Sequence, residues 1–116
     1  MEKLPIYNDA KALSIALARK ATVTNGPIEQ AFPAYLKSIL AKMPYFRRNP
    51  SDLSLLPIPE DLKRRSNLFA LVKGSGKRCV ILTGHYDVVQ TSMYGHLEPL
   101  AFDPEALRDR LLSDLD

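Results

Sequence analysis

Residues 67–84, which read NLFALVKGSGKRCVILTG, decide the fold that the sequence predicts. Two apolar and β-branched runs, 67–73 and 77–84, flank the short Gly-Ser-Gly connection at 74–76, an arrangement typical of an antiparallel hairpin. Residues 80–82 are Val, Ile and Leu with no polar residue between them. We therefore expect the second strand to be covered on both faces and to be central in its sheet.

A helix is expected near each end of the chain. The first has Asn8 or Asp9 as its N-cap and apolar residues at helical spacing, and it should end near 22–26, where β-branched residues, Asn and Gly disfavour a helix. The last has Asp103 as its N-cap and Pro104 at its first position, and it should run to the last residues.

Another helix is expected to begin at Pro27, because residues 28–43 repeat large apolar side chains at the spacing of about four helical turns. Pro33 lies inside this block, where a proline removes a hydrogen bond and collides with the preceding turn. We expect either a kink at Pro33 or a helix start nearer Gln30. An apolar stripe of this kind is more often core than ligand groove, and we interpret it as core.

The segment 44–63 is interpreted as a linker-like loop, because its prolines disfavour both helices and β-ladders. The predicted fold class is therefore α/β: two N-terminal helices, a β-hairpin with a central strand, and a C-terminal helix packed against the sheet. A chain of 116 residues makes one small domain or part of a larger one.

The charge of the chain is mild and uneven. The net charge is +3, and residues 103–116 are acidic while the rest of the chain is basic. The basic pairs Arg47-Arg48 and Arg64-Arg65 are short, so we interpret them as solvated surface and expect no nucleic-acid partner. Hydrophobic residues at 46% and charged residues at 25% are typical of globular proteins and disfavour a disordered chain.

The sequence has one cysteine, Cys79, which lies in an apolar run. An internal disulfide is excluded, and we expect a buried, reduced thiol, as in a cytoplasmic protein. Residues 1–20 lack the uninterrupted apolar stretch of a signal peptide, and no apolar run in the sequence approaches the length of a membrane span. We therefore expect a protein that is neither exported nor inserted into a membrane.

The sequence Gly84-His85-Tyr86-Asp87 follows the predicted central strand directly. A histidine at the carboxyl end of a buried strand lies where α/β folds place their ligands, and an aspartate two residues later can orient a metal-bound imidazole. His85 is therefore the candidate metal ligand and Asp87 the candidate residue beside it. On the residues alone, a hydrogen-bonded structural histidine is the other reading, and the more common one.

The wider sequence resembles a known enzyme family. Residues 80–89, VILTGHYDVV, closely resemble the first metal-binding motif of the M20 family of zinc-dependent peptidases and amidohydrolases. Residues 23–29 resemble the family's Ser/Thr-x-x-Gly-x-x-Glu segment before an amphipathic helix, and residues 65–70 resemble its Arg-x-Asn strand. Residues 94–104 resemble the arginine-utilisation (arginine degradation) branch of the family.

This resemblance implies that residues 1–116 are the amino-terminal part of a catalytic domain, a three-layer α/β/α sandwich that binds two zinc ions. It assigns His85 as a zinc ligand and Asp87 as a catalytic residue. Asp87 would be the carboxylate that fixes the tautomer and basicity of His85. Family chemistry is metal-assisted hydrolysis, in which a zinc-bound water attacks an amide carbonyl and a glutamate moves the proton.

Most of that catalytic machinery has no match in the sequence. The family's bridging aspartate in a Gly-rich turn and its Glu-Glu pair do not occur after His85. The other histidine, His96, follows a glycine in a polar stretch and is interpreted as a surface residue. One imidazole cannot hold a catalytic zinc ion, which takes about three protein ligands, so we expect the chain on its own to be inactive.

The preferred hypothesis is that the chain is the amino-terminal part of a zinc-dependent hydrolase of amide or peptide bonds, acting on a small arginine-related or peptide substrate. The alternative is a non-catalytic scaffold or homo-oligomerisation module that uses the edge of residues 68–72 and the helix face of Phe32 and Tyr35. A binding module that uses the basic pairs ranks third.

Overall fold

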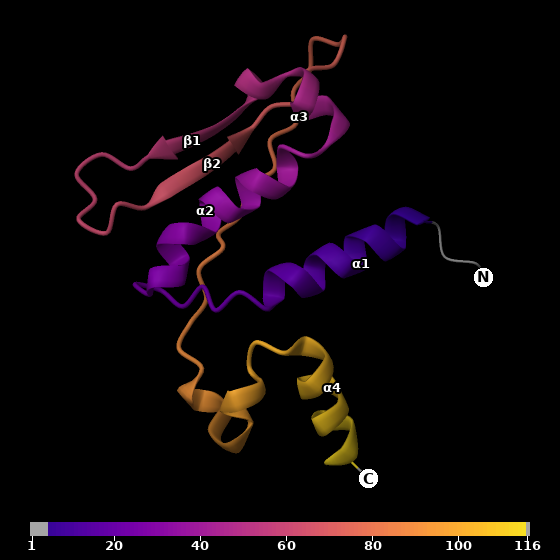
Figure 1. The fold of residues 1–116 in the computed structure, drawn as a ribbon, viewed down its shortest axis with the longest axis vertical. Coiled ribbons are helices and arrows are strands. Elements are labelled where there is room, and N and C mark those ends of the chain that lie inside the picture. The colour runs from indigo at the N-terminus through magenta and orange to yellow at the C-terminus, as the bar shows by residue number, and fades with distance from the viewer. Residues whose placement is uncertain (1–4, 116) are drawn as a thin grey trace. The chain divides into compact units, whose positions relative to one another are not determined.

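The structure is a computed structural model that describes residues 5–115, with side chains described from residue 9 onward (Figure 1). The chain divides into two compact units, and each is described by itself. Unit 1 consists of Met1–Ala21 together with Val88–Asp116, and unit 2 consists of Thr22–Asp87.

Unit 2 contains the sheet, whose strands differ from the predicted ones. Strand β1 (Leu53–Pro57) pairs antiparallel with β2 (Ser66–Ala70), and Leu55 lies opposite Leu68. The first predicted strand is therefore present as β2, but its partner precedes it in the chain instead of following it. The interpretation of residues 44–63 as a loop is wrong, because this segment contains β1 and two short helices.

The prolines of this segment lie where a missing N–H group costs little. Helix α3 (Pro44–Arg48) and the 3₁₀ helix η1 (Pro50–Asp52) each begin with a proline. Pro57 is the last residue of β1, and Pro59 lies in the turn that follows. The prolines therefore mark where short helices and a strand begin or end, and they do not make the whole segment a loop.

The carboxylate of Asp61 closes the β1–β2 hairpin. It accepts hydrogen bonds from the backbone N–H groups of Arg65 (2.9 Å) and Lys63 (3.3 Å). It also accepts from the Nε and Nη2 atoms of the Arg65 side chain, at 2.8 and 3.1 Å. The backbone N–H of Ile58 then donates to the carbonyl of Arg65 at 3.1 Å and extends the ladder beyond the strands. One side chain thus fixes the turn and the register of the hairpin.

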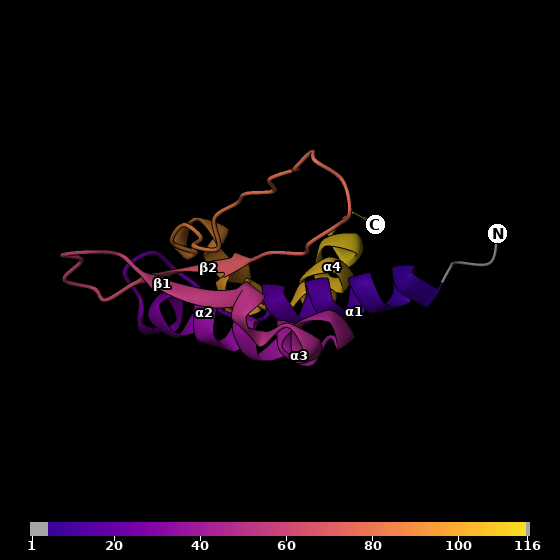
Figure 2. The same cartoon turned by 90° about the horizontal axis from the view of Figure 1, so that it is seen from above.

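Residues 77–84, predicted as the central strand, are not part of a strand in the described chain. Val80, Ile81 and Leu82 are 84%, 83% and 92% exposed, and Figure 2 shows this stretch leaving the sheet as an open arch. Cys79 is exposed as well, so the prediction of a buried thiol is wrong.

The chain directly after β2 stays bonded to the segment that precedes β1. Leu71 donates its backbone N–H to the carbonyl of Asp52 (2.8 Å), and Lys73 donates its own to the hydroxyl of Tyr45 (2.9 Å). The Lys73 ammonium group binds the buried Asp52 carboxylate at 2.7 Å. These bonds continue the β1–β2 pairing, because Leu71 lies opposite Asp52, one position beyond the Leu53–Ala70 pair.

Helix α2 (Pro27–Leu40) lies against both strands of the hairpin. It begins at Pro27 and runs through Pro33 as one element, so a start nearer Gln30 is wrong. Phe32 is buried, which confirms the core interpretation for it, whereas Ile28 at the start of the stripe is 41% exposed; Pro33, outside the stripe, is buried as well. Phe32 packs inside the unit, so it does not form the free helix face that the oligomer alternative requires.

Unit 1 contains α1 (Pro5–Ala18), the 3₁₀ segment η2 (Ser92–Leu100) and α4 (Pro104–Ser113). Helix α1 begins with a proline, whose fixed φ suits a first turn, so the predicted N-cap at Asn8 or Asp9 is wrong.

The N-cap of α4 is confirmed, since the side chain of Asp103 accepts from the backbone N–H of Ala106 at 3.2 Å. Arg19 joins the two ends of unit 1 by an ion pair with Glu105 at 2.6 Å. The packing of α4 against the sheet stays a prediction.

The α/β class predicted from the sequence is confirmed, with helices and a two-stranded antiparallel sheet. Among the helices of residues 5–115, none has both the length and the apolar character needed to cross a bilayer.

We predict that Asp61→Ala lowers the melting temperature by several degrees near pH 7, because the turn loses its hydrogen-bond acceptor. The pKa of Asp61 lies well below its usual range, and the main cause is the hydrogen bonding of its carboxylate by the Arg65 side chain. This stabilisation is therefore present above the unfolded-state pKa of about 3.9 and is lost as the pH falls below it. Thermal melts at several pH values should show the difference from wild type shrinking in acid. Glu60→Ala in the same turn is the control, and an equal effect of both variants would contradict the assignment.

Candidate metal-ligand site

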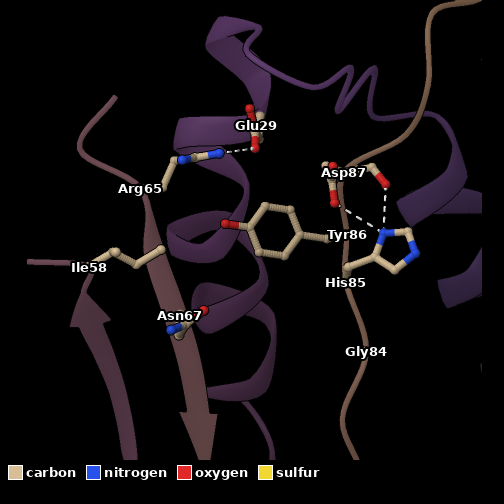
Figure 3. A pocket seen from close by; sticks show the side chains of 8 residues that line it. All are labelled: Glu29, Ile58, Arg65, Asn67, Gly84, His85, Tyr86 and Asp87. Carbon is tan, nitrogen blue, oxygen red and sulfur yellow. Dashed lines mark hydrogen bonds and ion pairs between the residues drawn. The ribbon is translucent and has the colours of Figure 1, made fainter. Parts of the chain in front are cut away.

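Tyr86 packs the predicted site segment against the core of unit 2 after the open arch. Its ring packs against Phe32 with centroids 5.4 Å apart, and its hydroxyl donates to the carbonyl of Ser66 at 3.0 Å. Burial is the main cause that raises the pKa of this hydroxyl. Because side chains alternate along an extended chain, His85 and Asp87 lie on the side opposite the Tyr86 ring, as Figure 3 shows.

The structure brings the two predicted site residues together. Nδ1 of His85 lies 3.0 Å from Oδ1 of Asp87 and 2.9 Å from the backbone carbonyl oxygen of Asp87 (Figure 3). Both partners are acceptors, so Nδ1 must carry the hydrogen. The lone pair of a neutral His85 is then on Nε2, and the side chain is 85% exposed. This arrangement leaves the nitrogen that could bind a metal open to solvent.

Two threonines that the sequence analysis did not identify bind the same segment. Thr22 donates its hydroxyl to the carbonyl of Tyr86 at 2.6 Å, and Thr24 donates to Oδ2 of Asp87 at 3.0 Å. The Thr24 hydrogen bond is the main cause that lowers the pKa of Asp87, with His85 a further one. The available signal was the resemblance of residues 23–29, which include Thr24, and no local pattern pointed to Thr22.

The other side of the segment borders an open pocket of about 270 Å³. Glu29, in the first turn of α2, is 3% exposed, and its Oε2 accepts from the backbone N–H of Asn25 at 2.5 Å. Its Oε1 lies 3.6 Å from Nη1 of Arg65, which links the helix to the hairpin turn. The pocket is lined by Glu29, Ile58, Arg65, Asn67, Gly84, His85, Tyr86 and Asp87 (Figure 3). Sequence reasoning placed Glu29, Arg65 and Asn67 only in a resemblance and gave them no role.

These residues include one candidate metal ligand, His85. Within the described part of the chain, no group of three His, Cys, Asp or Glu side chains lies together in a way that could hold a metal ion. A catalytic zinc ion takes about three protein ligands, and His85 could fill at most one of these positions. His96 is exposed in η2, as predicted. The described residues therefore do not form a zinc site on their own.

The sequence matches two proteins of Bacillus subtilis (strain 168). It is 35% identical to protein RocB over 102 residues, which are 85% of this chain and 18% of RocB. It is 36% identical to the uncharacterized protein YqjN over 102 residues, 87% of this chain and 18% of YqjN. This chain is similar to RocB over most of its own length. It spans about a fifth of the length of either relative.

The search of family models found no match for the chain. The search of solved structures also found none.

We predict that Asp87→Ala raises the population of the Nε2–H tautomer of His85, because Nδ1–H loses one of its two acceptors. Long-range ¹H–¹⁵N NMR of the imidazole at alkaline pH measures both tautomers of the neutral ring. Asp109→Ala, which removes an exposed carboxylate from α4, is the control. An unchanged tautomer ratio in Asp87→Ala would show that the carboxylate does not hold the ring.

Proposed function

We propose that this chain contributes His85 as one metal ligand to a zinc-dependent hydrolase of amide or peptide bonds of the M20 type, with a small, arginine-related substrate. One observation carries the proposal: Asp87 holds Nδ1 of an exposed histidine and leaves Nε2 open. In metal sites, a ligating histidine almost always donates its other ring N–H to a carboxylate, a carbonyl or water. Here Nδ1–H has a carboxylate and a carbonyl as partners.

The sequence similarity supports the same proposal. The match with RocB includes most of this chain, and residues 94–104 resemble the arginine-utilisation branch of the family. The pocket beside His85 offers space for a small polar substrate, since its lining combines carboxylates, a guanidinium and the amide of Asn67. Because a single His fills one ligand position, the proposal takes the other ligands and the general base from residues other than those described.

We place the protein in the cytoplasm as part of the proposal. Its one cysteine, Cys79, is an exposed free thiol, which fits a reducing compartment.

The test is a titration of the purified 116-residue chain with zinc chloride, followed through the ring resonances of its two histidines. We expect zinc to shift the Nε2 resonance of His85, with weak affinity because one ligand binds it. His85→Asn should abolish the response, and His96→Asn should leave it unchanged. Equal shifts of both histidines, or no shift of His85, would contradict the proposal. Without the remaining ligands, the chain should hydrolyse no amide substrate at any zinc concentration.

A second candidate function is a non-catalytic interaction module, which the exposure of the arch favours. Val80, Ile81 and Leu82 expose most of their apolar surface, and an extended backbone with free N–H and C=O groups can add to the sheet of another chain. If this is the function, wild type sediments as a dimer or larger species and Ile81→Lys sediments as a monomer. A wild-type monomer that unfolds cooperatively would contradict it. Lys77→Glu, which changes a charge in the same segment, controls for electrostatic effects.

A further inference from the structure

We infer that Thr24 is a positioning residue for His85, acting through the carboxylate of Asp87. The inference rests on the proposed function in one respect, since it takes the imidazole of His85 as the group that has to be oriented. Its geometric basis does not depend on a metal.

The Asp87 carboxylate has one donor on each oxygen. Thr24 donates to Oδ2 at 3.0 Å, and Nδ1 of His85 donates to Oδ1 at 3.0 Å. A carboxylate that is bonded at one oxygen can rotate about its Cβ–Cγ bond, whereas donors on both oxygens fix the plane of the group. Thr24 thus keeps Oδ1 directed at the imidazole.

The turn that carries Thr24 is itself fixed on both sides. Thr22, two residues earlier and 3% exposed, donates to the carbonyl of Tyr86 at 2.6 Å. On the other side, Gly26 donates its N–H to the carbonyl of Val23 at 2.8 Å. A Cβ atom at Gly26 would lie 2.8 Å from that carbonyl oxygen, so a larger residue would open the turn. The backbone on both sides of Thr24 is therefore held by contacts other than the Thr24–Asp87 hydrogen bond.

The buried carboxylate of Glu29 completes this arrangement. It accepts the backbone N–H of Asn25 at 2.5 Å, and it lies in the first turn of α2. A hydrogen bond of this kind ties the residue after Thr24 to the helix. The chain of contacts runs from the helix start, through the turn and Thr24, to Asp87 and then to His85. A free neutral imidazole populates both tautomers, and this chain of contacts selects the one with the Nε2 lone pair facing solvent.

The deciding experiment measures the His85 tautomer ratio by long-range ¹H–¹⁵N NMR in Thr24→Val, which keeps the shape of the side chain and removes the hydroxyl. We expect the ratio of Nε2–H to Nδ1–H to rise roughly 2- to 10-fold, the factor that one hydrogen bond contributes to an equilibrium. Thr24→Ser should restore the wild-type ratio, because serine keeps the donor. A wild-type ratio in Thr24→Val would overturn the inference.

The chain offers a matched control. Thr91 donates its hydroxyl to the carboxylate of Glu98 at 3.2 Å in unit 1, so Thr91→Val removes the same kind of hydrogen bond and leaves the Thr24–Asp87 contact in place. It should leave the tautomer ratio unchanged. Thr24 is exposed, and we expect Thr24→Val to fold, which its amide spectrum checks. If that variant unfolds, Thr24→Ala makes the same deletion, and a wild-type ratio in Thr24→Ala also overturns the inference.

Zinc titration of the same variants separates this inference from the proposed function. If both hold, Thr24→Val weakens the response of His85 to zinc by the factor that it changes the tautomer population, and Thr24→Ser does not. If zinc does not shift His85 in the wild type, the proposed function fails, and the tautomer ratio still decides the role of Thr24. If zinc shifts His85 equally in wild type and Thr24→Val while the tautomer ratio is unchanged, the inference fails and the proposed function stands.

Discussion

The site depends on the insertion of Tyr86 between helix α2 and strand β2. Its ring packs on Phe32, and its hydroxyl bonds to the carbonyl of Ser66, so one residue joins the two elements that form the core of unit 2. The residues before it form an open arch whose apolar side chains are exposed. Tyr86 thus joins the end of this arch to the core, and His85 and Asp87 are its neighbours in the chain. Neighbouring side chains of an extended segment point to opposite sides. The contact of Tyr86 with the core therefore directs the imidazole of His85 toward solvent.

Ion pairs also join helix α2 to the hairpin, on the wall of the pocket that Glu29 and Arg65 form. Arg65 is bonded to Asp61 in the hairpin turn and paired with Glu29 at the start of α2. Glu29 is almost completely buried, and a buried carboxylate needs hydrogen bonds or a charged partner. Glu29 accepts a hydrogen bond from the backbone N–H of Asn25, and its charged partner is Arg65. The turn before α2, which carries Thr24, is therefore connected to the hairpin through an ion pair, and both walls of the pocket share one electrostatic network.

The sequence predicted the elements that local chemistry determines. Helix α4 has its cap at Asp103, and His85 and Asp87 form a pair, because capping and a two-residue separation are local properties. The prediction was wrong about the partner of β2, because strand pairing depends on contacts between distant residues that the local pattern does not specify. Asp52 and Tyr45 bind the chain after β2 on the side of β1, and the side chain of Asp61 closes a turn that proline content had suggested was a loop. Thr22 and Thr24 lie more than sixty residues before the segment they bind, a separation that local spacing does not reveal.

Val80, Ile81 and Leu82 form an apolar stretch that the described residues leave exposed to solvent. Three consecutive apolar residues are typical of a strand covered on both faces, and within residues 5–115 nothing covers them. A sheet that pairs with this stretch would use its backbone groups, whereas a metal would use Nε2 of His85, three residues later and outside the apolar stretch. The two requirements do not compete. Strand pairing could therefore bury the arch without covering the imidazole, because Tyr86, Asp87 and Thr24 already hold His85 from the side of unit 2.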